Sequence, residues 1–285
     1  MDLSFVRFTR RVCGEVTLHV AEAGPDDGPL VILLHGFPEF WFGWRYQIGA
    51  LADSGFHVVV PDQRGYNLSD KPHGIARYDT DLLAADVIAL AAHYSADAFN
   101  LVGHDWGAVV AWWAATRYPE KVRRLAVLNC PHPAVAQDII RKDAAQRRAS
   151  WYIAAFQIPW LPETILRAAD FRSLLQAVRG SKTPLTDEEA ERYREAWRQP
   201  GALTGMINWY RAAPRHRFDP VAAGALKMPV QIIWGRQDPY VLPQLAEASV
   251  KLCADGHLTF LPDATHWVAH EEPDGVNAML TDFLK

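Results

Sequence analysis

Short apolar runs alternate with helix-length segments along most of this 285-residue chain, and this alternation restricts the fold more than any other feature. The runs end in turn residues, as strands buried on both faces of a parallel sheet do. They occupy residues 29–36, 57–62, 98–105, 125–131 and 229–238. Between them, residues 79–94 and 106–118 are helix-length segments, and residues 78–81 supply capping side chains for the first. The pattern predicts an α/β fold with a mostly parallel sheet covered by helices.

One segment beyond the fourth apolar run has the signature of an exposed helix. In residues 185–201, Thr186 and Glu189 form a capping box, and Glu188 and Arg192 form an i,i+4 ion pair. The sequence Pro-Gly at the end of this segment predicts that the helix stops there.

Strand patterning is absent from residues 133–218, which are helical in pattern and rich in tryptophan, arginine and proline. It returns at residue 229. We therefore expect three segments. Residues 1–132 and 219–285 form two parts of an α/β core, and residues 133–218 form a helical cap, or lid, inserted between them. In open α/β sheets ligands bind at the carboxyl ends of the strands, so a cap over that edge would enclose a dry pocket.

Charge and cysteine content restrict the partners and the compartment. The formal net charge is −4 and no run of basic residues stands out, which disfavours nucleic acid or an anionic membrane as a partner. Three dispersed cysteines, Cys13, Cys130 and Cys253, argue against a disulfide framework and fit a reducing compartment. The N-terminal residues contain no apolar core of signal-peptide length, and no stretch of the chain is long enough to span a bilayer, so we expect a cytoplasmic location. We expect a monomer or a homodimer.

Asp105 occupies the middle of the segment GHDWGA, directly after an apolar run and before a helix. Small residues at 103, 107 and 108 surround it, as the sharp turn of a nucleophile elbow requires. An ordinary helix N-cap would also explain an aspartate here, but it leaves the small residues unexplained. A carboxylate nucleophile suits an electrophilic saturated carbon, because the alkyl ester that it forms can be hydrolysed by water.

His266 is the expected base, since it follows the last strand and precedes the final helix. His270 is the competitor, and the i,i+4 spacing of the two histidines could also indicate a metal pair. No carboxylate or cysteine completes a ligand set at known spacing, so we expect no metal. Asp238 lies at a strand end between Asp105 and His266 and would orient the imidazole, although an aspartate before proline also forms turns.

The backbone N–H groups of Phe37 and Trp106 are the expected oxyanion hole. Phe37 belongs to HGFPEF, directly after a strand, and Trp106 follows the elbow residue. An ordinary Gly-x-Pro turn would explain the first segment equally well, but its pairing with an elbow favours the functional interpretation.

These segments together resemble the epoxide hydrolases of the α/β-hydrolase fold. The resemblance rests on HGFPEFWFGWRYQ, PDQRGYNLSDKP, GHDWGA, NWYRA and THW, and covers nearly the whole chain. It implies two cap tyrosines that hold the epoxide oxygen. TGMINWYRAAPR places one at Tyr210 and WYIAAFQIPW places the other at Tyr152. Either tyrosine could instead pack the cap against the core. Asn67 stands where relatives often have glycine, and asparagine tolerates a left-handed conformation.

The resemblance implies hydrolysis of a small lipophilic epoxide by water to a vicinal diol, without a cofactor. Haloalkane dehalogenases share GHDWGA and are the main alternative, although Phe37 replaces the asparagine that often binds halide in them. A non-catalytic small-molecule sensor on the same scaffold is a further alternative. Tryptophans in the cap and near the elbow suggest an apolar pocket, about half of them filling the core. These tryptophans are Trp41, Trp106, Trp151, Trp160, Trp209 and Trp267.

Overall fold

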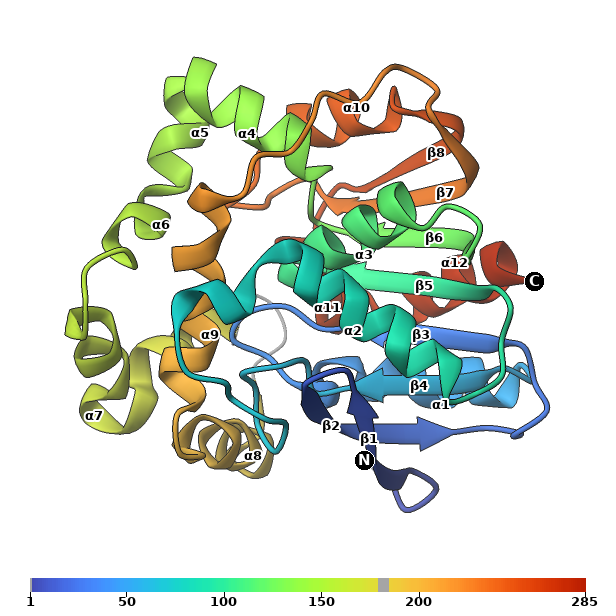
Figure 1. Cartoon of the computed structure of the whole chain (residues 1–285), viewed down its shortest axis with the longest axis horizontal. Helices are drawn as coiled ribbons and strands as arrows, with labels where there is room; N and C mark the ends of the chain where they lie inside the picture. The colour runs from blue at the N-terminus through green and yellow to red at the C-terminus, as the bar shows by residue number, and fades with distance from the viewer. Residues whose placement is uncertain (1, 179–184) are drawn as a thin grey trace.

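The computed structural model describes residues 2–178 and 185–285, and within this part of the chain eight strands form one sheet (Figure 1). Their order across the sheet is β1-β2-β4-β3-β5-β6-β7-β8. The central strands are β3 (Leu30–Leu34), β4 (His57–Pro61), β5 (Phe99–His104), β6 (Val122–Leu128) and β7 (Leu226–Gly235). These five strands run parallel to one another, which confirms the α/β fold with a mostly parallel sheet.

Each of the five apolar runs overlaps one of these strands; β3, β4 and β5 lie within their runs, whereas β6 and β7 each begin three residues earlier than predicted. Every residue of β3, β4 and β5 is buried. Burial of a valine, leucine or isoleucine side chain contributes about 1.5–3 kcal/mol, so these strands form the stable centre of the molecule. Their carboxyl ends meet at one edge of the sheet, where ligands bind in open α/β sheets and where the loops with the candidate site residues begin.

Three strands were not among the predicted runs. β1 (Arg7–Cys13) and β2 (Val16–Ala23) form an antiparallel hairpin, and β2 also pairs antiparallel with β4. β8 (Cys253–Leu261) adds a parallel strand beside β7 at the other edge. The edge strands β1 and β8 have mostly exposed or half-buried side chains, and in β2 half-buried polar residues interrupt the buried ones. These strands therefore lack the continuous apolar run that marks a central strand.

Helices cover both faces of the sheet. α2 (Thr80–Ala92) and α3 (Trp106–Arg117) pack against each other on the near face in Figure 1, while α1 (Arg45–Asp53) and α12 (Pro273–Leu284) pack together behind the strands. The short helices α10 (Gln244–Val250) and α11 (Val268–Glu271) follow β7 and β8. The predicted capping of α2 is confirmed, since the Asp79 side chain accepts a hydrogen bond from the backbone N–H of Asp81.

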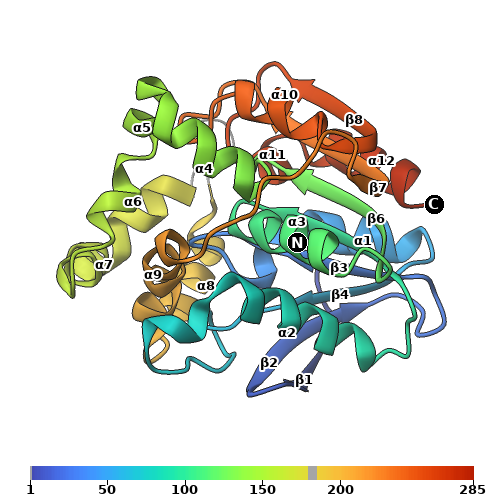
Figure 2. The same ribbon diagram turned by 45° about the horizontal axis from the view of Figure 1, so that its top comes forward.

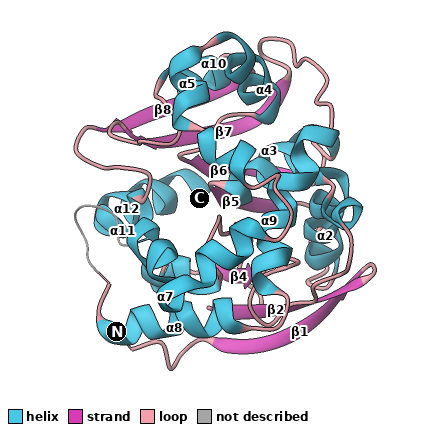
Figure 3. Ribbon diagram, turned by 90° about the vertical axis from the view of Figure 1, so that its left-hand side faces the viewer, coloured by secondary structure: helices cyan, strands magenta, loops and turns pink. Residues whose placement is uncertain are grey.

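Between β6 and β7 the described residues form six α-helices. They are α4 (Pro133–Lys142), α5 (Ala144–Ala149), α6 (Trp151–Ala155), α7 (Leu161–Val178), α8 (Asp187–Arg198) and α9 (Ala202–Ala212). α7 is interrupted by non-helical backbone at Ala168–Phe171. Figure 2 shows these helices at one end of the sheet, with α6 and α7 at the outer margin of the molecule, and Figure 3 views the molecule from that end.

The exposed helix predicted for residues 185–201 is α8. Its capping box is present in full, with Thr186 and Glu189 each accepting from the other's backbone N–H. Glu188 and Arg192 lie 3.0 Å apart as the expected i,i+4 pair. After α8 the chain turns at Gly201, which is left-handed with a φ of 78°. No helix in the described ranges is both long and apolar enough to span a bilayer.

Candidate active site

Asp105 stands on a strained turn between β5 and α3. Its φ of 50° and ψ of −122° are uncommon for a residue with a side chain, and its side chain forms no capping hydrogen bond to α3. The N-cap explanation is therefore wrong. The turn packs so tightly that a Cβ on Gly107 would lie 2.1 Å from the carbonyl oxygen of Leu34, and one on Gly36 would lie 2.4 Å from the Asp105 Cβ. These small residues let the chain hold Asp105 at the carboxyl edge of the sheet.

The structure brings Asp105, His266 and Asp238 together although they come from three distant loops. His266 Nδ1 lies 2.7 Å from Asp238 Oδ2, and His266 Nε2 lies 3.5 Å from Asp105 Oδ2. All three side chains are buried or nearly so. The imidazole thus lies between two carboxylates, with one nitrogen directed at each.

The contacts of Asp238 fit both of the roles that were considered for it. Its Oδ1 accepts hydrogen bonds from the backbone N–H groups of Tyr240 and Val241 and so forms a turn. Its Oδ2 faces His266 and also accepts a hydrogen bond from the Asn129 side chain at 2.7 Å. These contacts fix the carboxylate before it meets the imidazole, which is what an orienting acid requires.

The two carboxylates control the charge on the imidazole. Burial of His266 opposes protonation, but Asp238 and Asp105 outweigh it and raise the pKa of His266 to about 10. Burial likewise opposes ionisation of Asp105, whereas the hydrogen bond and charge of His266 lower the pKa of Asp105 below its usual value. At neutral pH Asp105 is therefore ionised beside a protonated His266, which is the state that a carboxylate nucleophile requires.

The backbone N–H of Phe37 donates to Asp105 Oδ1 at 2.8 Å. Trp106 is the first residue of α3, and the N–H groups of a first helical turn have no partner within the helix. The Phe37 donor thus contacts the Asp105 carboxylate from the loop after β3, and the Trp106 N–H lies at the start of α3, next to Asp105 in the chain.

Tyr152 and Tyr210 reach the same cavity as Asp105 from the segments α6 and α9. The cavity measures about 560 Å³, and its lining includes Trp106 and Val109 besides the two tyrosines and Asp105. The two phenol rings contact each other edge to face, with centroids 5.9 Å apart. Burial, reinforced by the Asp105 charge, raises the pKa of both tyrosines well above the usual value, so both phenols remain protonated donors.

The tryptophans divide as expected between pocket and core, with one exception. Trp106 and Trp151 line the cavity, whereas Trp41, Trp209 and Trp267 are buried in the core. Trp160 belongs to neither group, because 75% of its surface is exposed.

His270, the competing base, lies away from Asp105. Its Nε2 is 2.7 Å from Glu39 Oε1, and its Nδ1 is 3.0 Å from the Arg45 guanidinium. Its partners therefore differ from those of His266, and the i,i+4 spacing does not make the two rings into a ligand pair.

Sequence reasoning missed a buried polar network beneath the site. Glu39 accepts a hydrogen bond from the Tyr193 hydroxyl at 2.8 Å and faces His270 and His104. Burial favours the neutral acid, but the two histidines hold the pKa of Glu39 well below its usual range. His104 Nε2 in turn donates to the backbone carbonyl of His266 at 2.9 Å. The network ties α8 to the loop that carries His266. Its only local signal was a charged residue inside the apolar segment HGFPEF.

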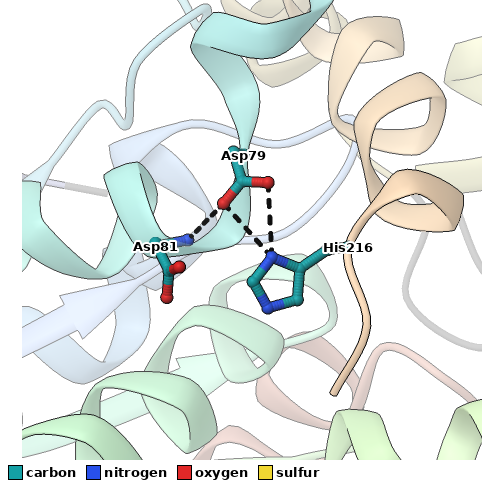
Figure 4. Close-up of side chains that lie close together, drawn as sticks. All are labelled: Asp79, Asp81 and His216. Atoms are coloured by element: carbon teal, nitrogen blue, oxygen red, sulfur yellow. Dashed lines mark hydrogen bonds and ion pairs between the residues drawn. The ribbon is translucent and has the colours of Figure 1, made fainter.

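A cluster of possible metal ligands lies outside the cavity, at the start of α2 (Figure 4). Ligand atoms of Asp79, Asp81 and His216 lie within 4.8 Å of one another. Hydrogen bonds already engage them, since Asp79 faces His216 Nδ1 at 3.2 Å and Asp81 accepts from the Trp113 indole at 2.7 Å. We interpret this cluster as a tie between α2 and the chain that returns from α9 to the core.

Comparison with known proteins agrees with the geometry. Residues 29–273 match the family described as the α/β hydrolase fold. The chain is 45% identical to the AB hydrolase superfamily protein YfhM of Bacillus subtilis, over 95% of each chain. It is 37% identical to human epoxide hydrolase 4, over 94% of this chain and 75% of that protein. The crystal structure of an epoxide hydrolase of Bacillus megaterium in complex with an inhibitor superposes with a TM-score of 0.88 at 33% identity, over 97% of this chain and 99% of that one.

Proposed function

Because the chain belongs to the epoxide hydrolases of the α/β-hydrolase fold, we propose that it converts lipophilic epoxides into vicinal diols through an alkyl ester on Asp105. The observation that carries the mechanism is the position of an ionised carboxylate on the elbow, where it faces an imidazolium within a cavity that also holds two protonated phenols. Residues 133–218 would act as the cap that closes this cavity.

In the first half-reaction a carboxylate oxygen of Asp105 attacks one ring carbon of the epoxide, and the bond from that carbon to the ring oxygen breaks. Tyr152 and Tyr210 donate to the developing alkoxide, which takes a proton from a phenol. The imidazolium of His266 supplies the replacement proton. General acid catalysis of this kind contributes about 10²–10⁴-fold in rate.

Ester formation changes the site in a way that prepares the second half-reaction. The carboxylate of Asp105 loses its charge, so one of the two groups that raise the pKa of His266 disappears. The ring, now neutral and still oriented by Asp238, can accept a proton from water. The same group thereby acts as an acid before the ester forms and as a base afterwards.

In the second half-reaction the hydroxide attacks the ester carbonyl carbon of Asp105. The backbone N–H groups of Phe37 and Trp106 would hold the tetrahedral oxyanion, and each such donor contributes about 3 kcal/mol in measured oxyanion holes. Collapse of the intermediate breaks the ester bond, and the leaving alkoxide takes the remaining proton of the added hydroxide, which completes the diol. Asp105 regains its carboxylate with one oxygen from water, and the first proton of that water stays on His266.

A product assay tests the reaction class. Purified protein is offered aryl and aliphatic epoxides beside chloro- and bromoalkanes of matched chain length. We expect diol from the epoxides and no halide from the haloalkanes, because the two phenols are suited to an opening epoxide oxygen. The variant Asp105→Ala is the control and should form neither product. Halide release without diol would instead assign the site to dehalogenation and leave both tyrosines with a packing role. Binding without turnover would favour the sensor.

A further inference from the structure

Large apolar side chains are exposed on one short segment of the cap, α6 to the first turns of α7. Five of them fall between residues 151 and 165, and their exposed fractions range from 38% to 75%. They are Trp151, Ile158, Trp160, Leu161 and Ile165. Neither Trp151 nor Trp160 stacks on another aromatic ring of the described residues, and neither indole N–H has a hydrogen-bond partner among them. Figures 1 and 2 place α6 and α7 at the margin of the molecule farthest from the sheet. We call these five residues the apolar cap face.

Unpaired arginines precede and follow the apolar cap face along the chain. Its neighbours in sequence include five arginines with no ion-pair partner in the described part of the chain: Arg141, Arg147, Arg148, Arg167 and Arg172. The acids of the same region are engaged: Asp138 pairs with Lys142, Glu163 with Arg211, and Asp170 with Arg198, while Asp143 caps α5. The cap segment is thus locally basic, a feature that the net charge of −4 for the whole chain conceals.

The apolar cap face is continuous with the cavity. Trp151 is 68% exposed and also lines the cavity, and so does Arg147, one turn before it. The remaining lining is mostly apolar and leads inward to Asp105 and Tyr152. The cavity therefore reaches the apolar cap face at Trp151, beside Arg147.

From this arrangement we infer that the apolar cap face docks onto the surface of an anionic phospholipid bilayer. Exposed tryptophan, isoleucine and leucine flanked by arginine have the composition of a surface that lies in a membrane interface. Tryptophan suits that boundary because its ring is apolar and its N–H remains hydrated, and each arginine near the lipid attracts the negative leaflet. A symmetric dimer formed through the apolar cap face fits less well. It would place the unpaired arginines of the two copies close together, where their like charges repel.

Docking would place the pocket mouth at the lipid, where apolar molecules accumulate. This consequence rests on the proposed function, whereas the docking itself does not depend on it. The two can be tested separately, because vesicle binding needs no substrate and turnover of a water-soluble epoxide needs no vesicle.

Vesicle flotation of the whole protein tests the docking. We expect binding to vesicles of phosphatidylcholine mixed with phosphatidylglycerol, weaker binding to phosphatidylcholine alone, and loss of binding as salt is added. The double variant Trp160→Ser/Ile165→Ser should bind at least about tenfold more weakly, because it removes two apolar side chains that would be buried in the lipid. Arg148→Gln/Arg167→Gln should bind the anionic vesicles roughly 30-fold more weakly. None of these four residues lines the cavity, so turnover of a water-soluble epoxide should stay at the wild-type level.

Val12→Ser is the matched control, since Val12 is 64% exposed but lies on β1, away from the cap; its binding should equal that of the wild type. Absence of wild-type binding to the anionic vesicles, or equal binding by all variants, would overturn the inference. So would a wild-type dimer that becomes monomeric in Trp160→Ser/Ile165→Ser without any binding to vesicles, because the face would then be an interface between copies.

Discussion

Replacement of His266 by glutamine is expected to trap the protein as an alkyl ester on Asp105. The glutamine amide cannot take a proton from water, so we expect the rate of ester hydrolysis to fall by about 10²–10⁴-fold. Ester formation should then be faster than ester hydrolysis, and the ester should accumulate. Mass spectrometry of the intact protein should show an increase equal to the mass of the epoxide. After proteolysis, the increase should map to the peptide that contains Asp105.

The matched control is His257→Gln, because His257 is exposed on β8 and lies outside the cavity. That variant should turn over at the wild-type rate and carry no adduct. Consumption of epoxide by His266→Gln at an undiminished rate, with no modified peptide, would show that water attacks the substrate directly.

Loss of the two phenol hydroxyls is the second large effect. Tyr152→Phe and Tyr210→Phe keep the aromatic rings that pack against each other and remove only the donors. Each single variant should slow alkylation of Asp105 by about 10²–10³-fold, as loss of one donor to a developing oxyanion does, and the double variant should be slower than either. Rapid-quench measurement of ester formation gives this rate, while the dissociation constant of the epoxide should change much less.

Tyr118→Phe provides the comparison, since Tyr118 ends α3 and does not line the cavity. It should leave alkylation unchanged. Wild-type diol formation by the double variant Tyr152→Phe/Tyr210→Phe would mean that the tyrosines only pack the cap, and the epoxide oxygen would need another donor.

The parts of the site that the sequence predicted are those whose constraints are local. Asp105 was recognisable because the glycines that its turn requires are immediate neighbours in the chain, and steric contacts below 3 Å explain them. Each central strand is buried on both faces and is therefore a continuous apolar run. Such a run can be recognised in the sequence without knowing which strands lie beside it. Asp238 and His266 could be predicted because each follows a strand at the expected place along the chain. Their distances from Asp105 could not be predicted from the sequence.

Other features depend on contacts between residues far apart in the sequence. Glu39 lies beside His270 and Tyr193 only because the loop after β3, α11 and α8 converge, so its place inside HGFPEF does not by itself reveal these partners. The β1–β2 hairpin was missed because its outer strand is mostly exposed and the short turn at Gly14 gives little signal. The unpaired arginines of the cap were equally hidden, since the pairing of their neighbouring acids appears only in three dimensions.

A single-turnover experiment in ¹⁸O-labelled water tests the covalent mechanism most directly. Enzyme in excess over epoxide is mixed in labelled water, and the diol and the Asp105 peptide are analysed by mass spectrometry. If the ester forms, the oxygen added to the first diol comes from the Asp105 carboxylate. The diol should then be unlabelled and Asp105 should carry one ¹⁸O. A labelled diol with unlabelled Asp105 would contradict the mechanism, because it would mean that His266 directs water straight onto the epoxide carbon.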